Sequence, residues 1–408
     1  MSDGNRKLRI LCCPANHGGC AYYRILMPMK KLAEKCADKV EIRFDDNPLG
    51  VDDEIKNTPK DFPYENIKWA DIVFTHNIHS RGGQYTINIL AKADELGKFT
   101  HYDTDDLLTD LYTGHRLYDV YKEQKLDEYT KAIYYNADLV SVTQKKFAER
   151  IKPFVRKALV VIKNAIDFEL PCWNLQWQKA PQKKLTRIGW VGGIHHEEDV
   201  KEFKSVVLGM NSKVGVENLR WTFHGRPPFK KGDKRDWQQD VWDNYERLLM
   251  HGVPMRQRKN IFFGHAMNGS EYGAFYRDMD ISIAPLQMNN FNDSKSDIKL
   301  MECGRYGVPL VASDIGCYNE TIIDGETGFL IPEDNPRRRW TEKLTLLAKN
   351  PKLRKEMGEN LRQVVNERFD INKHVGERYH LYKQLMEFKR QAMSKLKTKE
   401  NEQSNSNN

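Results

Sequence analysis

Short apolar runs alternate with helical repeats along the first part of the chain. The apolar runs end at glycine, proline or polar residues, and the segments between them place apolar side chains every three or four positions. Strands that alternate with helices in this way predict βαβ units and a parallel sheet. The strands expected here are 8–15, 70–76, 98–103, 137–143 and 157–167.

The alternation stops at 167–184, which contains two prolines, two tryptophans and no periodicity, and this predicts a linker. The pattern then restarts. A second set of strands is expected at 186–192, 219–225, 260–265, 280–286, 308–313 and 328–331. Two doubly wound α/β domains are therefore predicted, facing a central cleft, with ligands at the carboxyl ends of the strands. The expected boundaries are 1–175, 183–367, a C-terminal helix over 368–400 that packs back on the first domain, and a disordered tail over 401–408.

Composition supports a globular protein. The 408 residues are 39% hydrophobic and 30% charged, and no run of 18 apolar residues exists to span a membrane. Seven scattered cysteines without a C-x-x-C pair argue against a disulfide framework and a zinc site, and the start of the chain has no secretory signal. We therefore expect a reducing, cytoplasmic location. The net charge of +8 favours acidic partners such as nucleotide phosphates, nucleic acid or a membrane surface, or it reflects only a solvated surface.

One stretch, 292–330, carries the most specific chemistry. Three good N-cap residues at 292–294 predict a helix that begins near Ser294. Lys295, Lys299 and Glu302 stand at i, i+4 and i+7, and so would share one face. A helix N-terminus with two lysines favours phosphate, and a carboxylate one turn further on can accept from a ribose diol. The alternative is an exposed helix with an ordinary Lys–Glu pair.

The order of motifs around this stretch resembles a known family. "APLQMNNFNDSKSDIKLMECGRYGVPLVASDIGCYNETIIDGETGFLI" is similar to the donor site of GT-B glycosyltransferases, particularly the retaining family-4 group. "CCPANHGGCAYYR" resembles the first strand and glycine loop of these enzymes, and "VIKNAID" the close of their first domain. "IGWVGGIHHEEDV" and "DGETGFLIP" resemble the opening and close of the second domain. The resemblance implies a GT-B fold, in which an acceptor-side Rossmann-like domain faces a nucleotide-sugar-binding one.

Two departures from the family pattern affect the donor site. The family's Glu-x7-Glu requires glutamates at 294 and 302, but position 294 is Ser294. The Arg…Lys pair that is common after the first strand of the second domain is replaced by "GGIHHEED". Lys295 and Lys299, together with Arg226, would have to neutralise the diphosphate, so neither a metal nor another cofactor is expected. The donor-binding residues implied by the resemblance are Gly18, Gly19, Gly192, Gly193, Arg226, Gly264, His265, Lys295, Lys299 and Glu302.

The acceptor side is predicted from "FTHYDTDDLL", which supplies His101 and three carboxylates. Asp103 or Asp105 would orient the acceptor hydroxyl, and Lys299 would stabilise charge on the leaving diphosphate, so these three are the predicted catalytic residues. Helix capping with a solvated turn, or a metal site, are the alternatives for the aspartates. Further acceptor-side candidates are Tyr22, Arg24, His76 and Asp106, while His76 and His79 are equally consistent with hydrogen-bonded structural roles.

The function implied by the resemblance is transfer of a sugar from a nucleotide-diphospho-sugar, with a UDP-sugar favoured, to an acceptor hydroxyl, with retention. The acceptor is either a surface glycan or lipid, or a hydroxymethylated base in DNA, as in viral DNA-modifying enzymes of this fold. For DNA, the insertion 226–259 would contact phosphates together with the basic C-terminal helix. Its candidate contacts are Lys230, Lys231, Lys234 and Arg235. Alternatively, the apolar face of the C-terminal helix (Leu381, Leu385 and Phe388) would pack on the first domain.

Three other functional classes compete with sugar transfer. A sugar-nucleotide epimerase on the same scaffold and a non-catalytic nucleic-acid-binding protein stay open. A nicotinamide-dependent oxidoreductase needs G-x-G-x-x-G after a strand, a spacing that "ANHGGCAYYR" lacks.

Overall fold

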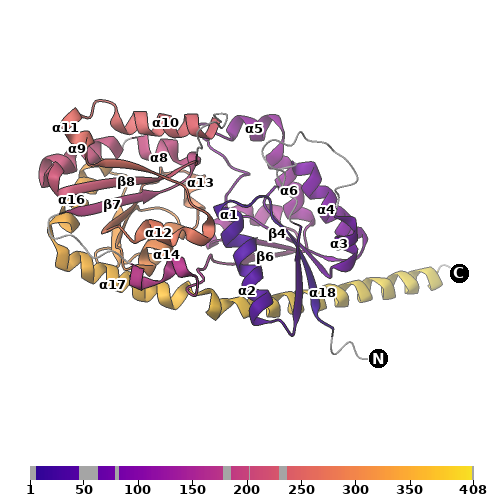
Figure 1. Cartoon of the computed structure of the whole chain (residues 1–408). Coiled ribbons are helices and arrows are strands. Elements are labelled where there is room, and N and C mark those ends of the chain that lie inside the picture. Colours follow the sequence, from indigo (N-terminus) through magenta and orange to yellow (C-terminus); the bar gives the residue numbers. More distant parts are fainter. Residues whose placement is uncertain are drawn as a thin grey trace.

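The computed structural model describes residues 6–45, 63–78, 82–177, 185–201, 203–228 and 237–406. Two α/β units lie side by side, and the last helix, α18 (Ile371–Ser406), runs from the second unit along the first (Figure 1). This is the predicted pair of doubly wound domains.

The first sheet is parallel throughout, with strand order β2-β1-β3-β4-β5-β6. Its central strands are almost wholly buried because helices cover both faces, as in other parallel sheets. The strands are β1 (Leu8–Cys13), β2 (Val40–Phe44), β3 (Ile72–His76), β4 (Phe99–Asp103), β5 (Leu139–Val142) and β6 (Ala158–Val161).

The helices of the first unit connect these strands. They are α1 (Gly19–Ala21), α2 (Met27–Lys35), α3 (Tyr64–Trp69), α4 (Gly83–Glu95), α5 (Tyr118–Glu123), α6 (Leu126–Asn136) and α7 (Lys145–Ile151), with a π-helical turn at Tyr22–Leu26 and a 3-10 turn at Lys152–Phe154.

The second sheet is also parallel, with strand order β12-β11-β10-β7-β8-β9. Counted within the domain, this is the 3-2-1-4-5-6 order of the Rossmann fold, whose switch point lies between the neighbours β7 and β10. The strands are β7 (Thr186–Val191), β8 (Leu219–Arg226), β9 (Ile261–His265), β10 (Ile281–Ala284), β11 (Leu310–Ser313) and β12 (Gly328–Ile331). The helices are α8 (Glu197–Lys201), α9 (Phe203–Val214), α10 (Trp237–Met250), α11 (Met255–Arg258), α12 (Gly273–Tyr276), α13 (Asn290–Asp293), α14 (Ile298–Arg305), α15 (Cys317–Thr321), α16 (Pro336–Lys349) and α17 (Pro351–Arg368), with 3-10 turns at Ile194–His196, Val216–Asn218 and Gly269–Glu271.

The linker packs against the second domain. Two 3-10 turns, Pro171–Trp173 and Leu175–Trp177, form its described part. Trp173 is buried beside Tyr306, whose hydroxyl donates to the Cys172 carbonyl. The apolar and aromatic residues of the linker therefore attach it to the second domain.

Part of the insertion 226–259 contributes to the second core. In α10, Val241, Trp242, Tyr245 and Leu249 are buried against that domain. Lys230, Lys231, Lys234 and Arg235 lie outside the described residues. The insertion therefore supplies a structural helix as well as basic sequence.

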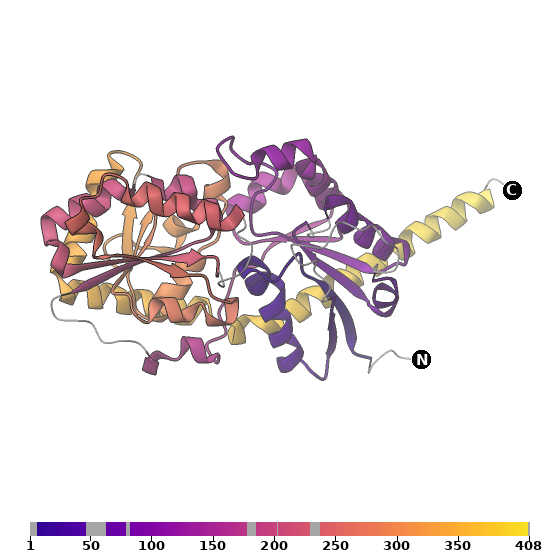
Figure 2. The ribbon, with the colours of Figure 1, turned by 45° about the horizontal axis from the view of Figure 1, so that its top comes forward.

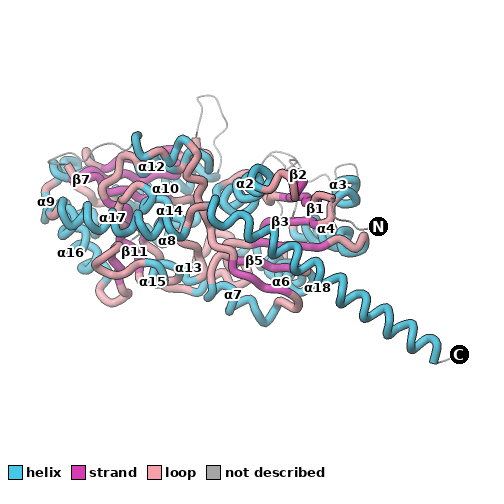
Figure 3. Tube along the Cα trace, turned by 90° about the horizontal axis from the view of Figure 1, so that it is seen from below, coloured by secondary structure: helices cyan, strands magenta, loops and turns pink. Residues whose placement is uncertain are grey.

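Helix α18 ties the C-terminus to the first domain and then extends past it (Figures 2 and 3). The hydroxyl of Tyr382 lies 2.8 Å from Nδ1 of His101, and Lys389 pairs with Asp138 at 2.6 Å. Phe388, predicted on the buried face, is 72% exposed. The helix continues to Ser406, where a disordered tail was expected, because its last turns contain helix-forming Lys, Glu and Gln and neither glycine nor proline.

Among the described residues, no helix has both the length and the apolar character needed to cross a bilayer.

Candidate functional site

The two domains meet along the carboxyl ends of their strands, and polar contacts bridge them. Lys295 Nζ lies 3.1 Å from Asp106, and Arg116 pairs with Glu197 at 2.8 Å. Asp293 accepts from two cations of α7, Lys146 and Arg150. Each of these pairs joins one domain to the other.

The predicted helix of the donor motif is divided into two. Asn289 caps α13 by accepting from the Asn292 amide, and α14 does not begin until Ile298. Lys295 therefore stands in the turn between the helices, and the expectation of one stripe holding Lys295, Lys299 and Glu302 was wrong. The predicted start failed because Ser294 ends α13: its hydroxyl bonds the Asn290 carbonyl and does not cap a new helix.

Lys295 and Lys299 differ in their partners. Lys295 pairs with Asp106 and lies over the Phe291 ring, 4.3 Å from its centroid. For half-buried Lys299, no hydrogen bond or ion pair is found within the part of the chain that the structure describes. Burial and the charge of Lys295 lower the pKa of Lys299 to about 8. A buried cation that lacks an anion gains the most from an incoming phosphate.

Glu302 is enclosed. It is only 2% exposed, and its two oxygens accept from the hydroxyls of Tyr23, at 2.6 Å, and Tyr276, at 2.8 Å. Burial raises the pKa of Glu302 to about 7, against the opposing effect of the two tyrosines and Lys299. The predicted contact with a ribose diol is blocked in this conformation, because both oxygens are already bonded and shielded.

The glycine loop after β1 lies against the second domain. The Gly18 amide donates to Asn16 Oδ1, and Gly19 begins α1. A Cβ at Gly19 would lie 2.7 Å from the Tyr272 hydroxyl, so glycine is needed for this close approach. Tyr22, predicted on the acceptor side, packs over Gly269 of the second domain, just as Tyr272 of the second domain packs over Gly19 of the first.

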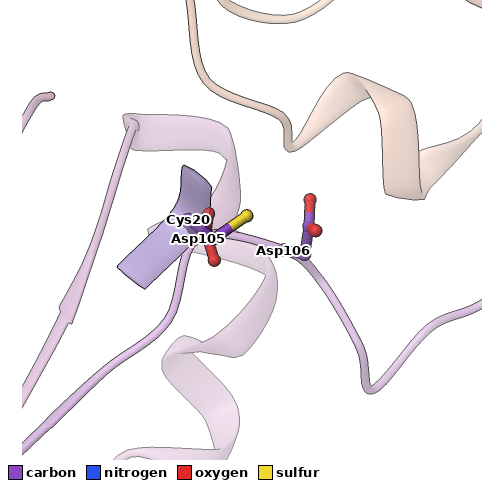
Figure 4. A group of neighbouring side chains, drawn as sticks. All are labelled: Cys20, Asp105 and Asp106. Carbon is purple, nitrogen blue, oxygen red and sulfur yellow. The ribbon is translucent and has the colours of Figure 1, made fainter. Parts of the chain in front are cut away.

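Asp105 and Asp106 stand at the end of β4 near the thiol of Cys20 (Figure 4). Asp105 is buried and accepts from Asn77 at 3.0 Å, and His76 Nε2 lies 3.6 Å away. Burial raises the pKa of Asp105, but hydrogen bonds with His76, Cys20 and Asn77 outweigh it and hold that pKa well below its usual range. Asp105 is therefore an anion at neutral pH. His79 lies outside the described residues.

Asp106 is the more accessible carboxylate, with a side chain 28% exposed. In Figure 4 it is turned toward the ribbon of the second domain, apart from Cys20 and Asp105. Cys20, Asp105 and Asp106 could together offer three ligands to a metal ion. Lys295 already supplies a positive charge to Asp106, so the metal-independent chemistry stays a prediction consistent with these contacts.

Asp103 and Arg24 form a buried pair within the first domain. Arg24 donates to both Asp103 oxygens, at 2.8 and 2.6 Å, and also to the Ile162 carbonyl and Asn164. The attraction of Arg24 outweighs burial and lowers the pKa of Asp103. Both side chains are buried and paired with each other, so these contacts do not support their predicted catalytic and acceptor-side roles.

His101 is likewise a core residue. Its ring is fully buried, stacks on Phe74 and bonds Tyr382 and Ser141, and burial lowers its pKa to about 3. His101 therefore supports the docking of α18 as a neutral ring.

The remaining donor candidates are divided between the cleft and structural positions. Gly193 faces open space, whereas a Cβ at Gly192 would collide with Trp190 and one at Gly264 with His224. His265 is exposed at the end of β9. Arg226 pairs with Asp243 and Glu246 of α10, so these contacts do not support its predicted phosphate role.

The structure adds residues that the motifs did not indicate. His115 and His195, one from each domain, stack at 5.5 Å between ring centroids, and each has a buried ring nitrogen without a partner. A cavity of about 140 Å³ lies beside them, lined by Tyr112, Arg116, His195, Glu197 and neighbouring residues. Tyr23, Tyr272 and Tyr276 were also missed. Tyrosines at such positions are common in cores, so sequence spacing carried no signal for them.

Comparison with known proteins places this geometry in context. Residues 255–364 match the family described as "Glycosyl transferases group 1". Trehalose synthase from Pyrococcus horikoshii is 32% identical over 141 residues, which cover 34% of this chain and 31% of that protein. D-inositol 3-phosphate glycosyltransferase from Corynebacterium glutamicum is 32% identical over 102 residues, or 25% of this chain and 23% of that one. The matched segments thus span about a third or less of these relatives.

Solved structures extend the likeness to nearly the whole chain. Sucrose-phosphate synthase from Thermosynechococcus elongatus superposes with a TM-score of 0.66 at 15% identity, covering 93% of this chain and 99% of that one. HepE from Anabaena, in complex with UDP and glucose, gives a TM-score of 0.63 at 12% identity, covering 92% and 100%. Identities this low establish the fold alone. The chain therefore has the GT-B fold, and its second domain carries, over residues 255–364, a segment of the group 1 glycosyltransferase type.

Proposed function

We propose that this protein is a glycosyltransferase that takes a sugar from a nucleotide-diphospho-sugar, with a UDP-sugar as the first candidate. One observation carries the proposal. Within the group 1 segment, Lys299 is a half-buried cation that makes no hydrogen bond or ion pair with any described residue, and Lys295 lies near it in the cleft. A diphosphate is the partner whose charge and size suit two neighbouring lysines at the edge of a Rossmann sheet.

The chemistry follows from where charge develops. The bond between the anomeric carbon of the sugar and the β-phosphate oxygen breaks, and negative charge grows on the leaving diphosphate. A fixed cation at that point stabilises the transition state more than the bound donor, and this difference accelerates transfer. Lys299 is the residue we assign to this role, and Lys295 supports it while paired with Asp106.

The incoming hydroxyl forms the new bond to the anomeric carbon and loses its proton. Asp106 is the accessible carboxylate on the facing domain, and Asp105 stands behind it as a buried anion. We assign contact with the acceptor hydroxyl to Asp106 and alignment of this loop to Asp105. Transfer with retention of configuration rests on the family resemblance, and the configuration of the product determined by NMR tests it.

We propose a carbohydrate or polyol as the acceptor. The support comes from the names of two relatives, trehalose synthase, which names a disaccharide, and D-inositol 3-phosphate glycosyltransferase, which names a polyol phosphate. The seven unpaired cysteines suit the reducing cytoplasm that we propose as the location. A hydroxymethylated DNA base is the competing acceptor.

The experiment is a matrix of radiolabelled donors and acceptors. UDP-glucose, UDP-galactose and UDP-N-acetylglucosamine are each incubated with glucose, inositol phosphate, a lipid extract or hydroxymethylcytosine DNA. We expect label on a carbohydrate acceptor with wild-type protein and a large loss with Lys299→Ala, while Lys201→Ala, an exposed lysine on α8, serves as a matched control. Isomerised donor in the absence of acceptor would support the epimerase instead, and label on DNA would overturn the carbohydrate acceptor.

A further inference from the structure

Tyrosines occupy the positions where the donor is expected to bind. The hydroxyl of Tyr23, from the first domain, donates to Glu302 of the second at 2.6 Å. Tyr276, from the same domain as Glu302, donates to the other carboxylate oxygen at 2.8 Å. If Glu302 receives the ribose hydroxyls, as the proposed function requires, Tyr23 occupies one of the acceptor positions that they need.

The contact at Glu302 is part of a reciprocal arrangement. Tyr22 of the first domain covers Gly269 of the second so closely that a Cβ at Gly269 would lie 2.3 Å from its ring. Tyr272 of the second domain covers Gly19 of the first in the same manner. The rings also contact one another, with centroids 5.2 Å apart for Tyr22–Tyr23 and 6.3 Å apart for Tyr23–Tyr272. We call Tyr22, Tyr23 and Tyr272 the tyrosine clasp.

The Glu302 carboxylate is enclosed in this closed arrangement, with only 2% of the residue exposed. One buried apolar cluster also runs across the boundary, joining Ala21 and Tyr23 to Tyr276 and Met301. The Glu302 carboxylate is therefore out of reach of a nucleotide-sugar while these contacts persist.

We infer that the tyrosine clasp holds the two domains closed, and that a nucleoside diphosphate binds Glu302 only after the Tyr23 hydroxyl has left it. Donor binding and domain opening are then linked. The conformation competent to bind is a fraction of the population, and the apparent dissociation constant is raised by the inverse of that fraction. Tyr23 is in this view a positioning residue, which exchanges its hydrogen bond for those of the donor.

The chain contains a matched pair of variants that tests this inference. Tyr23→Phe and Tyr276→Phe each remove one hydrogen bond to the same carboxylate, but only Tyr23 connects the two domains. UDP binding is measured by calorimetry, and the radius of gyration without ligand is measured by small-angle X-ray scattering. Tyr23→Phe should bind UDP about tenfold more tightly, because the lost bond to a charged group is of the size that corresponds to such a factor. It should also show a larger radius of gyration.

Tyr276→Phe should show neither gain. Equal or weaker UDP binding by folded Tyr23→Phe, or an unchanged radius of gyration, would overturn the clasp. The same tightening in both tyrosine variants would also overturn it, because that result would reflect exposure of the carboxylate and not release of a domain contact.

A second variant leaves Glu302 untouched. Gly269→Ala places a methyl group against Tyr22 and should open the domains and tighten UDP binding in the same direction as Tyr23→Phe. Failure of wild type and all variants to bind UDP or any other nucleoside diphosphate would contradict the proposed donor. The scattering comparison would still decide the clasp, so the two ideas fail separately.

Discussion

At the scale of single residues, Lys299 concentrates the predicted chemistry. Replacing Lys299 with Ala should lower kcat/KM for transfer by roughly 10²–10³, the usual cost of removing a group that stabilises developing charge. Steady-state kinetics on a folded variant checks this, with Lys201→Ala as control. Wild-type kinetics in Lys299→Ala would show that Lys299 does not contact the leaving diphosphate.

The titration of Lys299 gives a second prediction. Its pKa of about 8 means that it is cationic below that pH and neutral above it. UDP affinity of the free protein should therefore fall as pH rises through about 8, and Lys299→Arg should keep its affinity in the same range because arginine stays charged. Calorimetric titrations from pH 6.5 to 9.5, a window chosen to bracket that pKa, provide the measurement. Parallel curves for the two proteins would contradict it.

Glu302 predicts how stability depends on pH. Its folded pKa of about 7 exceeds the ordinary value of about 4.3, so the folded state binds more protons between these values. Its contribution to the free energy of unfolding is therefore complete below the unfolded pKa, declines as pH rises, and levels off above about 7. In the wild type, this decline in the free energy of unfolding should total a few kcal/mol, and Glu302→Gln should lack it. Urea unfolding at pH 5 and pH 8 measures the change in the free energy of unfolding for each protein. An equal change in wild type and Glu302→Gln would refute the raised pKa of Glu302.

The buried Arg24–Asp103 pair separates a structural from a catalytic aspartate. Asp103→Asn leaves a buried guanidinium without its countercharge and should destabilise the fold by about 3–5 kcal/mol. Asp105→Asn, which keeps the size of the side chain, should lower turnover more than stability. Denaturant unfolding together with kinetics distinguishes them. A stable but inactive Asp103→Asn would restore the catalytic role first predicted for Asp103.

At the scale of elements, the alternation of apolar runs with helical repeats was sufficient to predict the two parallel sheets. All the strands expected from it are present. β2 was missed although "VEIRF" alternates like a half-buried strand, because this short edge strand contains no continuous apolar run. The start of α14 was misplaced because capping residues at 289–294 serve α13. The contacts of Arg226, Glu302 and Asp103 could not be predicted, because each partner lies on another element and meets the residue only in the packed tertiary structure.

Helix α18 offers a prediction at this scale. Its first half is anchored by Tyr382 and Lys389, whereas in Figures 1 to 3 its last turns project away from the body. Truncation after Gln391 should leave the melting temperature nearly unchanged. Tyr382→Ala should lower it by several degrees, because a buried ring and its bond to His101 are lost. Equal losses in both variants would mean that the projecting turns stabilise the fold.

At the scale of the whole molecule, the net charge of +8 bears on the identity of the acceptor. If DNA were the acceptor, each phosphate contact would release counterions, and log affinity would fall with log salt with a slope of about −0.9 per contact. Lys230 and Lys231 are the candidates in the insertion, and replacing both with Ala should then reduce the slope by about 2. Because we propose a carbohydrate acceptor, we expect only weak DNA binding, with the same slope in wild type and the double variant. A salt titration followed by fluorescence anisotropy measures this. A slope that falls by about two units, together with labelled DNA in the transfer assay, would make DNA the substrate.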